Sequence, residues 1–160
     1  MNSQTNLTLG DGVLISKILI GFDGTECSQR ALDFGLELAD KFSASVTILN
    51  VVELPVYGIP EDPLAASAAM PSFIKDLRKA HEDVLNKAAK RTANLKPNVG
   101  VSLELREGNP PEQIVAIATE RSFDVVVVGH GGEGRIRELF LGGTSERVAH
   151  LARCVVVIVK

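Results

Sequence analysis

The sequence predicts a single α/β domain, an open, doubly wound parallel sheet of five strands in the order 3-2-1-4-5 with helices on both faces. The chain of 160 residues has the length of one domain. Hydrophobic residues make up 45% of it but aromatic residues only 4%, so aliphatic side chains supply the apolar mass, as in helices packed on a buried sheet. Short β-branched runs alternate with segments of helical periodicity, which is typical of right-handed β-α-β units.

The first elements of the domain follow a polar start. Residues 1–16 are mostly polar and are expected to form a loose tail, so the folded domain runs over 17–160. An apolar run at 17–22 predicts the first strand, and Asp23-Gly24-Thr25 breaks it before apolar residues at helical spacing predict a helix. A β-rich run at 45–52 predicts the second strand.

The segment 54–70 is too long for an ordinary connection between two elements. It carries three prolines, a glycine and an Ala/Ser stretch, and loops of this length often serve as lids, so we expect a mobile lid here. From Pro71, apolar residues at spacings of three and four predict an amphipathic helix that ends near Pro97.

The rest of the chain predicts three more strands and two more helices. Alternation of apolar and polar residues predicts one strand with one face exposed to solvent. A run of four valines predicts a strand buried at the centre of the sheet. In chain order the predicted elements are the strand 101–106, the helix 110–121, the strand 125–128, a glycine-rich segment 129–143, the helix 144–152 and the strand 154–159.

Charge and hydropathy exclude several classes of protein. The formal net charge is -3, so the positive field that drives non-specific nucleic-acid binding is missing. No run approaches the roughly 18 to 20 apolar residues of a membrane span, and the polar start lacks the basic residues of a signal peptide. We therefore expect a cytoplasmic protein with no nucleic-acid or membrane partner, in which Cys27 and Cys154 are free thiols.

Glycines after the fourth predicted strand carry the clearest chemical signal. Residues 129–134 match G-x-G-x-x-G, the dinucleotide fingerprint, but the strand that follows ends in Val159-Lys160 without the acid that would hold a ribose. The P-loop pattern is also missing, because no Lys follows a glycine at the required offset. A different spacing fits better: Gly129, two residues, Gly132, nine residues, Gly142, and then Gly143, Thr144 and Ser145.

This spacing, together with Asp23-Gly24-Thr25 and the apolar last strand, resembles the universal stress protein family, whose nucleotide-binding members carry G-x2-G-x9-G-[ST]. The resemblance spans 17–160 and implies a site for ATP, with or without Mg²⁺, at the carboxyl ends of the first and fourth strands. It places Asp23 on the ribose and the backbone of Val51 on the adenine. It places the phosphates on Gly129, Gly132, Gly142, Gly143, Thr144 and Ser145. The sequence departs from the family pattern at Gly143, where the family has Ser or Thr.

The residues support an anion site without the family. Glycines let backbone N–H groups approach an oxyanion closely, and a helix that opens at 142–145 presents free N–H groups and a positive dipole end. A structural interpretation stays open, in which Asp23 caps the first helix and the glycines shape a tight loop. No G-x-S-x-G elbow or paired His or Cys spacing points to a serine nucleophile or a metal site.

We expect a regulatory switch in which bound ATP biases a conformation through the lid, because the glycine loop holds no evident general base. A nucleotide-independent dimeric stress protein and a slow ATPase remain as alternatives.

The last predicted strand, 154–159, is uninterrupted and apolar, and we expect it at an edge of the sheet. An exposed edge of this kind favours pairing with another strand. The resemblance likewise implies a twofold homodimer through this strand.

Overall fold

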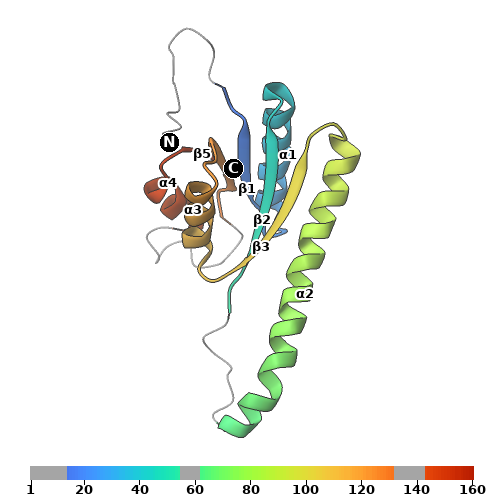
Figure 1. Ribbon diagram of the computed structural model, residues 1–160, viewed down its shortest axis with the longest axis vertical. Coiled ribbons are helices and arrows are strands. Elements are labelled where there is room, and N and C mark those ends of the chain that lie inside the picture. The colour runs from blue at the N-terminus through green and yellow to red at the C-terminus, as the bar shows by residue number, and fades with distance from the viewer. Residues whose placement is uncertain (1–13, 55–61, 132–142) are drawn as a thin grey trace.

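The computed structural model describes residues 14–54, 62–131 and 143–160, which form a five-stranded sheet flanked by helices (Figure 1). The elements are β1 (Lys17–Gly21), α1 (Glu26–Phe42), β2 (Ser45–Val52), α2 (Pro63–Leu95), β3 (Val101–Glu107), α3 (Pro110–Glu120), β4 (Val125–Gly129), α4 (Thr144–Leu151) and β5 (Val155–Val159). The strands are parallel and lie in the order β3-β2-β1-β4-β5. The predicted fold class and strand order are confirmed.

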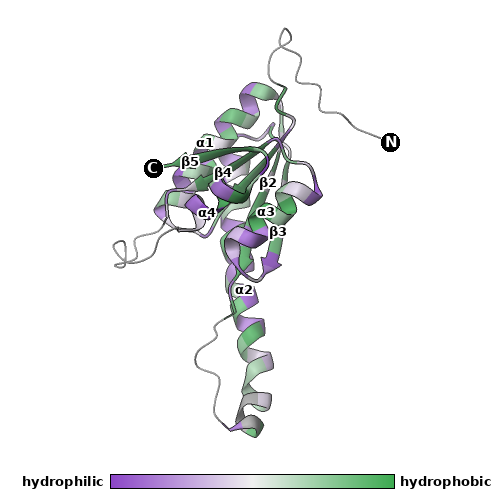
Figure 2. Ribbon diagram, turned by 90° about the vertical axis from the view of Figure 1, so that its left-hand side faces the viewer, coloured by the Kyte–Doolittle hydropathy of each residue, from purple (hydrophilic) through white to green (hydrophobic). Residues whose placement is uncertain are grey.

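Two hydrophobic clusters hold the helices against opposite faces of the sheet. Because successive strand residues point to opposite faces, Ile18 and Ile20 of β1 join the cluster under α1 and α2, while Leu19 joins the cluster under α3 and α4. The strands accordingly form an apolar layer inside the helices, which Figure 2 shows in green. Helix α1 approaches β1 so closely that a Cβ on Gly35 would lie 2.5 Å from the Ile20 side chain.

Helix α2 begins before the residue that the sequence predicts. The expectation of a lid is wrong for residues 63–70, which form the first turns of the helix. Residues 55–61 of the expected lid lie outside the described residues. The Asp62 side chain caps the helix by accepting a hydrogen bond from the Leu64 N–H at 3.0 Å. Pro63 takes a first-turn position, where its missing N–H costs nothing, and the alanines that follow favour helix.

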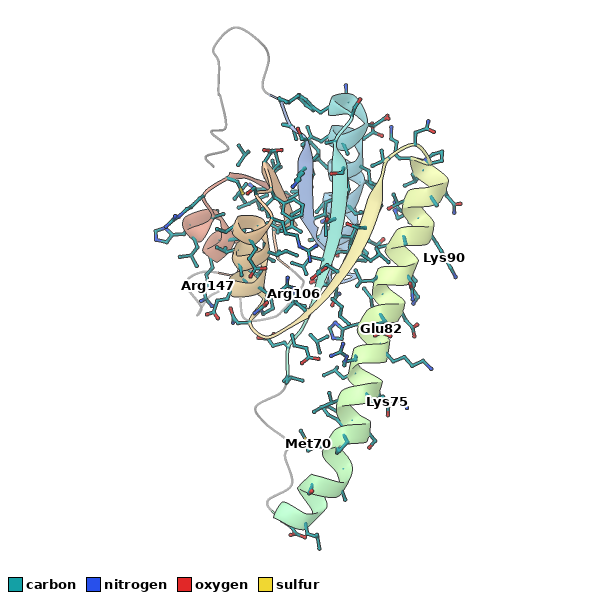
Figure 3. All side chains as sticks on the ribbon, viewed as in Figure 1. Met70, Lys75, Glu82, Lys90, Arg106 and Arg147 are labelled. Atoms are coloured by element: carbon teal, nitrogen blue, oxygen red, sulfur yellow. The ribbon has the colours of Figure 1, made fainter. Side chains whose placement is uncertain are left out.

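The length of α2 gives it two distinct parts. Its C-terminal part packs on β2 and β3, whereas its N-terminal part extends well beyond the sheet (Figures 1 and 2). Figure 3 shows Met70 on the extended part and Lys75, Glu82 and Lys90 spaced along the helix. These three charged residues are exposed, as the interleaved charge pattern of this helix indicates.

In the part of the protein that the structure describes, no helix is both long and apolar enough to cross a membrane.

The two edge strands differ in how they meet solvent. At the β3 edge, Glu104 contacts Arg106 at 2.7 Å and Arg121 at 3.0 Å, so charged side chains cover this strand. Burial opposes ionisation of Glu104, but the hydrogen bonds from the two arginines outweigh it and lower its pKa. At the other edge, β5 leaves Val155 59% and Ile158 37% exposed, so its apolar surface is open.

Candidate functional site

A cavity of about 500 Å³ lies at the carboxyl ends of β1, β2 and β4. Strand β1 pairs with β2 on one side and with β4 on the other, so the strand order reverses here. Helix α1, which follows β1, and helix α4, which follows β4, pack on opposite faces of the sheet. Ligands of doubly wound sheets bind in the crevice at such a position. Residues from α2, α3 and the start of α4 complete the wall.

The cavity brings together most of the predicted site residues that the structure describes. The predicted site residues that line it are Asp23, Val51, Gly129, Gly143 and Thr144. Ser145 does not line it, because its side chain is only 3% exposed and turns into the fold from the first turn of α4. Gly132 and Gly142 lie outside the described residues.

Asp23 is held by the turn that follows it. Its Oδ1 accepts hydrogen bonds from the Thr25 N–H at 2.9 Å and the Thr25 hydroxyl at 2.6 Å. Desolvation in the cavity wall opposes ionisation, but these hydrogen bonds outweigh it and lower the pKa of Asp23. The carboxylate is therefore ionised at neutral pH. Thr25, and not Asp23, is the N-cap of α1, since its hydroxyl oxygen accepts from the Ser28 N–H at 3.3 Å.

Val51 presents backbone groups at the end of the sheet. In a parallel strand both backbone groups of a residue point to one side, and the side alternates along the strand. The Leu49 carbonyl accepts from Phe22 on the β1 side, and the Val52 carbonyl accepts from Gly108 on the β3 side. The N–H and carbonyl of Val51 therefore point to the β1 side. Because β1 ends opposite Leu49, β1 offers them no partner.

The glycines of the site serve different purposes. A Cβ on Gly129 would lie 2.7 Å from the carbonyl carbon of Cys27, so glycine is needed there for α1 to begin against the end of β4. Gly143 has open space around its Cα and φ of −57°, which any residue adopts. Gly143 is the N-cap of α4, and no side chain caps this helix from that position. Helix α4 therefore begins at the cavity wall, where its first N–H groups have no partner within the helix.

Sequence reasoning missed several residues of the wall. Pro110 and Ile114 of α3 line the cavity, and the rule that ligands sit beyond the carboxyl ends of strands could have identified the β3–α3 connection. Glu53, directly after β2, could have been found in the same way. His81 lies within α2, far from any strand end in the sequence, and only the packing of α2 on β2 and β3 brings it to the cavity.

The doubly wound sheet defines an α/β protein with a cavity where the strand order reverses. The family model described as "Universal stress protein family" matches residues 15–160. The chain therefore belongs to the universal stress protein family, and the predicted resemblance is confirmed.

Individual relatives extend this match. A universal stress protein of Methanocaldococcus jannaschii is 30% identical over 148 residues, which cover 92% of this chain and 83% of the relative. A solved universal stress protein in complex with cAMP has a TM-score of 0.63 at 23% identity, and the match covers 92% of this protein and 98% of that one. A family protein from Arabidopsis thaliana with AMP bound has a TM-score of 0.62 at 18% identity, and the match covers 90% of both proteins. These two structures share the fold.

Proposed function

We propose that this protein binds ATP in the cavity and acts as a regulatory switch. One observation carries the proposal: three kinds of group suited to the three parts of a nucleotide lie in the wall of one cavity. They are the backbone donor and acceptor at Val51, the carboxylate of Asp23, and the helix N-terminus at Gly143 and Thr144. These groups suit a base, a ribose and a set of phosphates respectively.

Val51 is suited to adenine because the base carries a donor and an acceptor side by side. The exocyclic amine of adenine donates and the adjacent ring nitrogen accepts, which complements a backbone carbonyl and N–H on one strand edge. Leu49 and Ile114 line the same cavity, and their apolar side chains would pack against the flat faces of the base.

The ribose and phosphates have separate partners. The ionised Asp23 would accept hydrogen bonds from ribose hydroxyls, which are donors that a carboxylate binds strongly. The free N–H groups and the dipole of α4 would hold phosphate oxygens at Gly143 and Thr144. Because Gly143 has no hydroxyl, Thr144 is the hydroxyl-bearing residue at this position of the cavity wall. Phosphate contacts from Gly132 and Gly142 stay a prediction.

Two related structures support the choice of base. Their bound ligands, cAMP and AMP, both carry adenine. We propose a triphosphate because the spacing Gly129, Gly132 and Gly142 resembles the pattern of the ATP-binding members of the family. A Mg²⁺ ion with the nucleotide would take most of its ligands from phosphate and water, since the described residues contain no group of three His, Cys, Asp or Glu side chains placed to hold a metal.

A switch fits the position of α2. His81 of α2 lines the cavity, while the N-terminal part of the helix lies well beyond the sheet (Figure 1). A nucleotide with different affinities for two placements of α2 would shift the population between them, and the extended part would change its position. Slow ATP hydrolysis remains the alternative; it predicts release of inorganic phosphate over hours, which the switch does not require.

We also propose a twofold homodimer through β5. This strand is at the edge of the sheet, and Val155 and Ile158 are exposed on it. An apolar edge without charged residues favours pairing with another strand. The same observation favours the second candidate function, a dimeric interaction protein that acts without nucleotide.

We infer a cytoplasmic location from the chemistry of the two cysteines. Cys27 and Cys154 are free, and free thiols are usual in reducing compartments. Burial raises the pKa of the Cys154 thiol, so this residue is a poor nucleophile at neutral pH.

The nucleotide proposal is tested in two steps. Freshly purified protein is denatured and the supernatant is chromatographed, and an adenine nucleotide in near-stoichiometric amount is expected.

Calorimetric titration of nucleotide-free protein with ATP then compares the Asp23→Ala variant with Asp83→Ala, a control at an exposed acid on α2. Asp23→Ala should weaken binding by about tenfold or more, because hydrogen bonds to charged groups are strong. Equal affinities of the two variants would remove Asp23 from the site, and no ATP binding by the parent would favour the nucleotide-independent protein.

A further inference from the structure

Asn50 is a polar side chain in the core beneath the cavity. It is 2% exposed, on the sheet face that α1 and α2 cover. Its Nδ2 donates to the Phe22 carbonyl at 2.7 Å, and its Oδ1 lies 2.5 Å from Nδ1 of His81. Strand β2 is thus joined both to the turn after β1 and to α2 through one buried amide.

The direction of each hydrogen bond follows from the chemistry of the groups. A carbonyl oxygen only accepts, so the Asn50 amide must present its NH₂ to Phe22 and its oxygen to His81. His81 must therefore donate from Nδ1, and the neutral ring carries its proton there. The two hydrogen bonds run in one direction, from α2 through β2 to the backbone of Phe22.

Phe22 is the residue directly before Asp23, and β2 holds both of its backbone groups. The Phe22 N–H donates to the Leu49 carbonyl at 2.8 Å, and the Phe22 carbonyl accepts from Asn50 at 2.7 Å. The backbone is therefore fixed beyond the last residue of β1 at the point where the Asp23 side chain starts. Gly24, the next residue, has φ of +86° and packs against α2, since a Cβ there would lie 3.2 Å from Val84.

We propose that His81 and Asn50 are positioning residues of the nucleotide site, which set the backbone at Phe22 and thereby the carboxylate of Asp23. The proposal rests on the proposed function. It also makes α2 part of the site: a movement of α2 that separates His81 from Asn50 releases the turn that holds Asp23. The site and the extended helix are coupled through these two hydrogen bonds.

The test compares three variants on α2. His81→Leu removes the donor at similar size, His81→Gln restores an N–H donor within reach of Asn50, and Asn86→Leu is the control, because Asn86 is exposed on the same helix. The first readout is the dissociation constant of 2′,3′-dideoxy-ATP divided by that of ATP. Because the dideoxy compound lacks both ribose hydroxyls, this ratio measures how strongly Asp23 binds them. The parent ratio is expected at about tenfold or more.

His81→Leu should weaken ATP binding and reduce this ratio to about twofold, whereas His81→Gln and Asn86→Leu should keep the parent ratio. A structural role alone would lower thermal stability or affect both ligands equally, and would leave the ratio unchanged. An unchanged ratio in folded His81→Leu overturns the proposal.

A second readout needs no nucleotide. The Thr25 N–H donates to Asp23, so its hydrogen exchange in the nucleotide-free protein should accelerate by about tenfold in His81→Leu and recover in His81→Gln. If the Thr25 exchange rate does not change, positioning by His81 is wrong whatever the protein binds. If it changes as expected but the parent binds no ATP, the proposed function is wrong and the positioning of Asp23 by α2 stands.

Discussion

Gly129 at the end of β4 lies directly against Cys27 in the first turn of α1: a Cβ on Gly129 would be 2.7 Å from the Cys27 carbonyl carbon and 2.8 Å from its oxygen. Both of these atoms belong to the backbone, so they cannot turn aside as the end of a flexible side chain does. Glycine at this position is therefore a packing requirement between β4 and α1, independent of any phosphate.

Gly129→Ala should accordingly destabilise the nucleotide-free protein. Relieving the collision requires a backbone shift, which costs about 1 to 3 kcal/mol. Gly100→Ala is the matched control, because nothing lies within 4 Å of a Cβ there. The free energies of unfolding come from urea denaturation. A Gly129→Ala variant as stable as Gly100→Ala would show that α1 and β4 separate easily.

Gly143→Ser should strengthen ATP binding. The backbone at Gly143 has φ of −57° and open space, so serine fits without strain and can also cap α4. A hydroxyl bond to phosphate is worth about 1.4 kcal/mol, or about tenfold in the dissociation constant. Calorimetry measures the change.

Thr144→Val identifies the hydroxyl in use in the parent. If Gly143→Ser leaves the dissociation constant unchanged while Thr144→Val raises it, Thr144 already supplies the hydroxyl. Should neither variant differ from the parent, backbone N–H groups alone hold the phosphates.

Thr25→Val should change both the stability and the acid response of the protein. It removes the N-cap of α1, which costs about 1 kcal/mol at neutral pH. It also removes the hydroxyl that donates to Asp23, so the pKa of Asp23 should rise toward its ordinary value. NMR titration of the Asp23 carboxyl measures the shift.

The sign of the pH effect follows from the lowered pKa of Asp23. A carboxyl whose pKa is lower in the folded state stabilises the fold above its unfolded pKa, and this contribution disappears as the pH falls through the folded pKa. Thr25→Val should therefore lose less stability than the parent between neutral and acid pH. An unchanged Asp23 pKa in the variant would contradict the assigned hydrogen bonds.

Ile158→Pro should separate the proposed dimer without unfolding the protein. The Val155 N–H donates to the Asp124 carbonyl, and the Val159 carbonyl accepts from the His130 N–H. The backbone groups of Val155 and Val159 therefore point toward β4. Because this direction alternates along a strand, the backbone N–H and carbonyl of Ile158 point to the open edge. Proline there removes an outward N–H and keeps the β4–β5 ladder.

Light scattering at micromolar concentration gives the mass of each variant, and Ile158→Ala, which keeps the N–H, is the control. A dimeric parent, a largely dimeric Ile158→Ala and a monomeric Ile158→Pro with a similar melting temperature are expected. A monomeric parent would exclude pairing through β5 at this concentration, and a dimeric Ile158→Pro would move the interface elsewhere.

Patterns local in the sequence predicted the layout of the fold. Apolar and β-branched runs indicated four strands, alternation of apolar and polar residues indicated the strand at 101–106, and helical spacing indicated the four helices. The alternation of strands with helices favoured a parallel doubly wound sheet. The rule for strand ends then pointed to the turn at Asp23 and to the glycines after β4. The inferences about the fold succeed because they depend only on neighbours in the sequence and on the handedness of the connections.

Helix α2 shows where local patterns mislead. Its prolines suggested a loop, but Pro63 lies in the first turn, where proline is tolerated, and the alanines after it favour helix. Pro71, the expected start of the helix, lies inside it.

The sequence by itself determined the type and order of the elements and indicated the end of the sheet where the cavity lies. Only the tertiary structure decided that His81, 31 residues after Asn50 in the sequence, completes its hydrogen bonds, that Ser145 is buried away from the cavity, and that Gly129 is glycine because Cys27 lies against it. Periodicity says which residues point inward. Which partner each of them meets depends on how elements distant in sequence pack together, and that is set by the shape of the whole core.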